Sequence, residues 1–236
     1  MCVAALAWLA HPRWRLVAIG NRDEFHARPA AALARWDSGI LAGRDLQAGG
    51  TWLGVHDAGR FALVTNRRVK GYPRPAMASR GALVTSCLLG EALTVGAAMN
   101  PFSMFCVNGA NAALLTNYPA GRQIALDAGI YGLSNGAPED RWCKTRRLEA
   151  ALSQWLESDR AATALLDPLA DETLDPADPG NAFSAPFIRH PQYGTRCSSV
   201  IAVDRGGSGV IIERRFDAAG EPAGDTVLRF QWPAQL

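Results

Sequence analysis

The first residue with potential chemistry is a cysteine at position 2, directly after the initiator methionine and at the head of the apolar run CVAALAWLA. Methionine before a small residue is usually removed during synthesis, and Cys2 would then carry a free α-amine beside its thiol. An α-amine titrates at about 7.7–8.0 and a thiol at about 8.5, so the amine can accept the thiol proton at neutral pH. Cys2 would therefore supply both nucleophile and base, unless it is only a small buried residue that permits methionine removal.

The segment NRDEF ends a second apolar run with polar residues. Side chains alternate along a strand, so Asn21 and Asp23 share one face while Arg22 and Glu24 share the other. We expect Asp23 to face the amino terminus and to hold the α-amine by charge-assisted hydrogen bonds. Arg22 is expected to face away and to hold the loop that follows, unless the strand has already broken at that point. The alternative for the whole segment is the solvated exit of a strand.

Three asparagines follow apolar or strand-like runs and are candidate oxyanion donors: Asn66 in LVTN, Asn117 in LLTNYP and Asn135 in YGLSNG. A side-chain amide can donate to a developing oxyanion, and losing one such donor typically costs about 10²–10³ in rate. Each asparagine has the alternative of capping a turn, and the Asn-Gly pair makes that alternative strongest for Asn135. We therefore rank Asn135 below Asn117.

Arg196, in YGTRCSS, stands at the head of a predicted strand of the same sheet. A guanidinium beside a cysteine lowers the thiol pKa and can bind a carboxylate or an acyl oxygen. The alternative is a surface salt bridge.

Composition excludes several classes of function. The 236 residues are 48% hydrophobic and 19% charged, with a net charge of +2, which is typical of a globular chain and does not favour nucleic acid as a partner. The histidines are far apart and no cofactor motif is present, so no metal and no cofactor are predicted. The five cysteines form no CxxC pair, and their odd, dispersed count predicts reduced thiols in a cytosolic protein.

Nothing in the sequence predicts a signal peptide or a membrane span. The first apolar run is short, and its basic residues Arg13 and Arg15 follow it rather than precede it. No stretch approaches the roughly 20 apolar residues of a membrane-spanning helix. We therefore predict a soluble protein in the cytoplasm.

The elements that must position these residues are strands at both ends and in the middle, with helices between them. Hairpins are predicted over 2–20, 49–66 and 101–119, and further strands are predicted after residue 195. Helices are predicted for 79–88, 91–99, 139–157 and 160–170, and residues 27–50 are predicted to be loop. This order favours an α+β fold, and no linker divides the chain, so we predict a single domain over residues 1–236.

Met-Cys, NRDEF, GGTWLG, YGLSN and YGTRCSS occur in this order over nearly the whole chain. The set resembles the NRDE family, also called the transport and Golgi organisation 2 family. That family is similar in turn to N-terminal nucleophile hydrolases of the penicillin V acylase and bile salt hydrolase type. The resemblance implies a four-layer αββα sandwich.

The hydrolase pattern maps onto Cys2, Asn21 and Asp23 and departs at Gly20, which stands where the hydrolases have an arginine. Arg196 is a candidate to replace that arginine, and Trp52 of GGTWLG is a candidate for the pocket wall.

The resemblance implies an amidohydrolase or acyltransferase acting on a small amide or acyl substrate. Because the family is linked to lipid homeostasis and to haem, the alternative is a binding or carrier protein with an apolar pocket for a hydrophobic ligand. Retention of Cys2 and Asp23 favours the enzyme, and the missing arginine favours the carrier.

Overall fold

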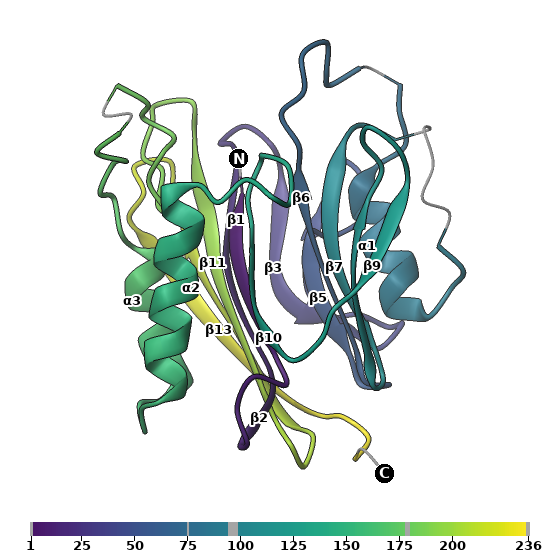
Figure 1. The fold of residues 1–236 in the computed structure, drawn as a ribbon. Helices are drawn as coiled ribbons and strands as arrows, with labels where there is room; N and C mark the ends of the chain where they lie inside the picture. The colour runs from purple at the N-terminus through teal and green to yellow at the C-terminus, as the bar shows by residue number, and fades with distance from the viewer. Residues whose placement is uncertain (1, 75, 94–98, 178–179, 235–236) are drawn as a thin grey trace.

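The computed structural model describes residues 2–74, 76–93, 99–177 and 180–234, and its strands form two antiparallel sheets that lie face to face (Figure 1). The first sheet has the strand order β10 (Gly129–Leu133), β1 (Val3–Trp8), β2 (Trp14–Phe25), β11 (Tyr193–Asp204), β12 (Ser208–Phe216) and β13 (Pro222–Gln231). The second has the order β3 (Ala30–Arg35), β4 (Ile40–Asp45), β5 (Leu53–His56), β6 (Arg60–Asn66), β7 (Phe102–Asn108), β8 (Asn111–Thr116) and β9 (Arg122–Ala125).

Helices cover the outer face of each sheet, so that the molecule has four layers (Figure 1). The first sheet is covered by α2 (Cys143–Leu156), the short 3-10 helix η1 (Ala162–Leu165) and α3 (Leu166–Leu169). The second is covered by α1 (Arg80–Leu89). This arrangement confirms the predicted α+β sandwich.

The apolar runs at the start of the chain form a strand pair buried on both faces. In β1, Ala4 and Leu6 point toward the second sheet, whereas Val3 and Ala5 point toward α2 and α3. All four side chains are fully buried. Near-continuous apolarity is the pattern of a strand with no solvated face, which is why this hairpin could be predicted from the sequence.

The prediction of loop for residues 27–50 is wrong, because the segment folds into β3 and β4. The two strands are joined by a tight turn in which the Trp36 amide donates to the Ile40 carbonyl at 2.7 Å. Gly39 takes a positive φ of 85° in that turn. The predicted helix from Glu91 to Met99 falls largely on residues 94–98, outside the described residues.

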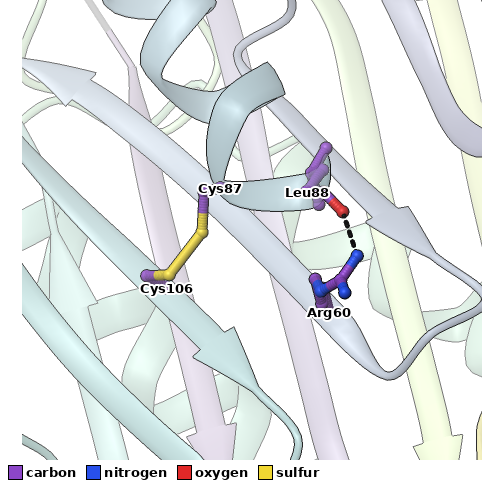
Figure 2. The surroundings of a disulfide bond; sticks show 4 residues. All are labelled: Arg60, Cys87, Leu88 and Cys106. Carbon is purple, nitrogen blue, oxygen red and sulfur yellow. Dashed lines mark hydrogen bonds between the residues drawn. A yellow bond between two sulfur atoms is a disulfide. The ribbon is translucent and has the colours of Figure 1, made fainter. Parts of the chain in front are cut away.

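The prediction that all cysteines are reduced thiols is wrong for two of them. Cys87 of α1 is joined by a disulfide to Cys106 of β7 (Figure 2). The physical reason is that α1 lies across the second sheet and brings position 87 over β7. Beside the disulfide, the Arg60 side chain donates to the Leu88 carbonyl at 3.1 Å and holds the end of the helix (Figure 2).

The search for membrane spans covered the described residues, and it found no helix with both the length and the apolar character that crossing a bilayer requires.

The contact that fixes the start of α1 gives a testable prediction. A Cβ on Gly50 would lie 2.5 Å from the backbone carbon of Gly81, so Gly50→Ala forces two backbone segments apart. We expect this substitution to lower the free energy of unfolding by about 1–3 kcal/mol, measured by urea denaturation. Gly180→Ala is the matched control, because nothing lies within 4 Å of a Cβ there. Equal stability of the two variants would contradict the close packing.

Candidate functional site

A cavity of about 510 Å³ opens between the two sheets where the first strand begins. The end of β2, β4, the start of α1, the start of β11 and the end of β12 contribute to its wall. Among the residues that line it are Cys2, Arg22, Asp23, Trp52, Asn66 and Arg196. The structure therefore gathers six of the nine predicted site residues into one wall.

Cys2 lies at the inner edge of this cavity and is only 7% exposed. Its carbonyl accepts a hydrogen bond from the Ser134 hydroxyl at 3.0 Å, and the next residue, Val3, pairs with Asn21 of β2. Burial raises the pKa of the Cys2 thiol, although the positive charge at the chain's amino terminus opposes that effect. Burial therefore favours the protonated thiol over the thiolate.

Asp23 is a buried carboxyl group, on the strand next to β1. Its Oδ1 accepts a hydrogen bond from the Thr195 hydroxyl at 2.8 Å, and its carbonyl accepts one from the Tyr193 hydroxyl. Burial raises the pKa of Asp23 from 3.8 to about 6, against the lowering effects of the positive amino terminus and of Lys144. The positive charge at the amino terminus therefore acts directly on the Asp23 carboxyl group.

Asn21 shares the face of Asp23, as the alternation predicts, but it does not line the cavity. Its amide donates to the carbonyls of Leu169 and Pro186 at 2.8 and 3.0 Å and accepts from the Ser198 hydroxyl at 2.6 Å. These bonds fasten β2 to α3 and to the segment before β11, so the contacts of Asn21 are structural.

The expectation that Arg22 faces away is wrong. β2 continues without a break to Phe25, so Arg22 lies on the face opposite Asp23, as the alternation predicts, but this is the face on which Cys2 lies and the cavity opens. Its Nη2 lies 3.5 Å from Asp45 and 3.8 Å from Glu24. The arginine is 9% exposed, and its Nη1 has no hydrogen-bond partner in the described part of the chain.

Arg196 braces the loop that Arg22 was expected to brace. The register of β11 against β2 shifts between Thr195 and Cys197, which leaves Arg196 in an irregularity of the strand. From there its guanidinium donates to the carbonyls of Phe25, His26 and Arg28 at 2.9–3.2 Å. Arg196 is part of the cavity wall, but these bonds tie it to the turn that follows β2.

Trp52 occupies the space beside Gly20. A Cβ built on Gly20 would lie 3.2 Å from the Trp52 ring and 2.9 Å from the Val3 carbonyl. No side chain fits there without displacing its neighbours. The Trp52 ring in the cavity wall is thus one of the groups that leave no room for an arginine at position 20.

Of the three asparagines, only Asn66 lines the cavity. Its carbonyl accepts a hydrogen bond from the Asn135 amide at 2.6 Å. Asn117 instead accepts from the Phe102 amide at 2.9 Å and donates to the Met99 carbonyl at 3.1 Å. Asn117 therefore holds the segment that leads into β7, and the Asn135 side chain holds the backbone of Asn66.

The comparisons with known proteins show the family of the chain. The family model described as Transport and Golgi organisation 2 matches residues 1–218. The chain belongs to the transport and Golgi organisation 2 family. The Mus musculus homolog of that protein is 32% identical over 239 residues, covering 85% of this chain and 86% of the mouse protein. The Homo sapiens homolog is 32% identical over 243 residues with the same coverage.

Among solved structures, the chain is similar to the Caenorhabditis elegans ortholog of N-acylethanolamine-hydrolyzing acid amidase. The TM-score is 0.51 at 11% identity, and the match covers 85% of this chain and 92% of that one. At this identity the likeness concerns the fold, and it confirms the predicted sandwich of the N-terminal nucleophile hydrolase type.

Sequence reasoning missed several buried polar groups around the cavity of this family member. Glu213 of β12 lines it, and its Oε1 accepts a hydrogen bond from the Leu33 amide of β3 at 2.7 Å. Burial raises the pKa of Glu213 and raises that of the neighbouring Cys197 thiol well above its ordinary value. Lys144 is buried at the start of α2 and donates to the Phe183 carbonyl at 3.2 Å. In the sequence these charges look like ordinary solvated positions.

Glu213 joins the two sheets across the cavity, and this gives a second prediction. Glu213→Ala removes the acceptor of the Leu33 amide and should lower the free energy of unfolding by about 1–3 kcal/mol, measured by urea denaturation. Glu213→Gln keeps a carbonyl oxygen at the same place and should lose clearly less. Equal losses in the two variants would show that the hydrogen bond does not hold the sheets together.

Proposed function

We propose that the chain is an N-terminal-cysteine amidohydrolase, or an acyltransferase built on the same parts. The observation that carries the proposal is the placement of Cys2 in the wall of a cavity, with the buried Asp23 on the adjoining strand. The proposal takes its reaction class from the N-terminal nucleophile fold and its residues from this geometry.

In the proposed mechanism the Cys2 thiol attacks the carbonyl carbon of an amide, and the thiol proton passes to the α-amine of the same residue. That amine becomes free when Met1, which lies outside the described residues, is removed. Because burial raises the pKa of the thiol, the sulfur keeps its proton until the amine accepts it. Nucleophile and base then act together instead of through a preformed thiolate.

The tetrahedral intermediate places negative charge on the former carbonyl oxygen. Asn66 is the proposed donor to this oxyanion, because it is the one predicted asparagine that lines the cavity. The carbon–nitrogen bond then breaks, and the α-ammonium returns its proton to the leaving amine. Water, or the amine of an acyl acceptor, attacks the resulting thioester and releases the thiol.

Asp23 is the proposed positioning residue for the α-amine. An ionised carboxylate would hold the ammonium by charge-assisted hydrogen bonds, while Thr195 fixes the carboxylate itself. Arg196 is assigned an indirect role, because its hydrogen bonds order the turn that carries the end of β2.

The alternative function is a carrier for lipid or haem on the same fold. Gly20 in place of arginine and the raised pKa of the Cys2 thiol favour it. The charged side chains in the cavity, among them Arg22, Asp45 and Glu213, disfavour a wholly apolar ligand. The enzyme is therefore the better supported function.

Release of the α-amine is the first property to test. The chain produced without additions is compared with one carrying a non-cleavable tag ahead of Cys2, and intact mass establishes which form has lost Met1. In the processed chain, we expect the rate of Cys2 alkylation to rise as the pH passes the amine pKa of about 7.7–8.0. In the tagged chain, we expect this rise only at higher pH. Peptide mapping assigns the label to Cys2, with Cys2→Ala as the blank. Identical pH profiles for the two forms would leave the carrier function.

The carboxyl group of Asp23 gives a pH prediction. Below about pH 6 it becomes protonated and no longer positions the α-amine by accepting its hydrogen bonds, so the rate of Cys2 alkylation should fall more steeply there than the amine alone dictates. Asp23→Asn should remove this steeper limb and slow the reaction by about 10², because the amine is no longer positioned.

The same carboxyl group also makes the stability of the fold depend on pH. Here a rise in pH lowers the free energy of unfolding, whereas a fall in pH lowers the alkylation rate. Its folded-state pKa of about 6 is raised above 3.8, so its contribution is fully present below pH 3.8 and is lost as the pH rises to 6. Asp23→Asn should flatten the unfolding free energy over this window. A wild-type profile retained by the variant would contradict the assignment.

A further inference from the structure

We infer that the substrate carries an anionic oxygen group, a carboxylate or a phosphate, within a few bonds of the scissile carbonyl, and that Arg22 binds it. This inference rests on the proposed function and names the substrate class of the same site.

The first step is the position of Arg22 relative to the sulfur. Val3 pairs with Asn21, so one position further along the antiparallel pair brings Cys2 opposite Arg22. Neighbouring strands lie about 4.8 Å apart, and both side chains line the same cavity. A group bound by Arg22 is therefore close to the carbonyl that Cys2 attacks.

The second step is the unsatisfied hydrogen-bonding capacity of Arg22. Its Nη1 is buried without a hydrogen-bond partner in the described ranges, and its two acidic contacts, at 3.5 and 3.8 Å, use Nη2 alone. Asp45 forms a shorter ion pair with Arg28, at 2.7 Å, and its carboxylate also accepts hydrogen bonds from the Gln47 and Ala48 amides. A ligand carboxylate or phosphate would supply the missing acceptor in the geometry that a guanidinium prefers.

The third step is the charge of the cavity wall. Its arginines outnumber its carboxyl groups, six to four: they are Arg22, Arg28, Arg44, Arg80, Arg196 and Arg215, against Asp23, Glu24, Asp45 and Glu213. The start of α1 adds partial positive charge, because Ser79 and Arg80 line the cavity and Ser79 makes no side-chain capping bond. The site is thus built for a negatively charged ligand.

The test uses three substrates that differ in one group. N-butanoylglycine carries the carboxylate, N-butanoylglycinamide replaces it with a neutral amide, and N-butanoylaminomethylphosphonate replaces it with a phosphonate. Binding to Cys2→Ala is measured by ligand-observed NMR titration, which needs no turnover, and hydrolysis by the processed wild-type chain is measured in parallel. We expect one of the two anions to bind about 10–100-fold more tightly than the glycinamide, as for hydrogen bonds to a charged group.

Variants of Arg22 in the same background assign this preference. Arg22→Gln should abolish it, and Arg22→Lys, which keeps the charge, should retain part of it. Arg35→Gln is the matched control, because Arg35 pairs with Asp57 on the surface and does not line the cavity. Its preference should equal that of the unsubstituted background.

The outcomes separate this inference from the proposed function. Equal binding of charged and neutral compounds, or a preference that survives Arg22→Gln, overturns the anion site, and hydrolysis of the compounds would still support the enzyme. Selective binding that depends on Arg22 but leads to no hydrolysis supports the anion site and counts against the enzyme. The stronger of the two anions identifies whether the group is a carboxylate or a phosphate.

Discussion

The pairing of β1 with β2 is the constraint on which the rest of the site depends. The backbone register sets Val3 against Asn21, and it thereby places Cys2 and the NRDEF segment at one end of the sandwich. A slip of one residue would turn every side chain of β1 to the opposite face. Because both faces are buried under different layers, such a slip would disrupt two cores at once. The apolar runs that look merely structural therefore fix the position of the reactive residue.

Two local features of the strands decide how Arg22 and Arg196 are oriented in the cavity wall. β2 stays regular through Phe25, which keeps Arg22 on the face of Cys2, whereas β11 is irregular at Arg196 and releases that side chain toward the turn. An arginine at the position of Gly20 would crowd the Val3 carbonyl, the Ala4 side chain and the Trp52 ring. Positive charge beside the cysteine is thus supplied two residues further along the same face of β2.

Much of the fold could be predicted because its signals are local. The first hairpin, the strands before and after Asp57-Ala58-Gly59, and the amphipathic α2 all follow from apolar periodicity and turn residues. β3 and β4 escaped prediction because β3 is largely exposed and alanine-rich, so its alternation is faint. Their existence depends on pairing with each other and with β5, which no local pattern encodes.

The candidate site was predictable where alternation along one strand suffices, and it was not where tertiary contacts decide. The shared face of Asn21 and Asp23 follows from the period of two. The orientation of Arg22 relative to Cys2 required knowing that Cys2 lies on the face of the sheet opposite to that of Asp23, which alternation along β2 alone does not give. Asn66 ends β6 and Asn117 follows β8, and only the pairing of β8 with β7 brings the Asn117 side chain to the Phe102 backbone.

The electrostatics of the site show why its polar groups must act together. Burial raises the pKa of both Cys2 and Asp23, and the positive charge at the amino terminus lowers both. The same positive charge therefore opposes the effect of burial on both groups. Moving that charge away would raise both pKa values further. The ionisation of this site is consequently a property of the chain's first residues and the end of β2 as a unit, and no single side chain sets it.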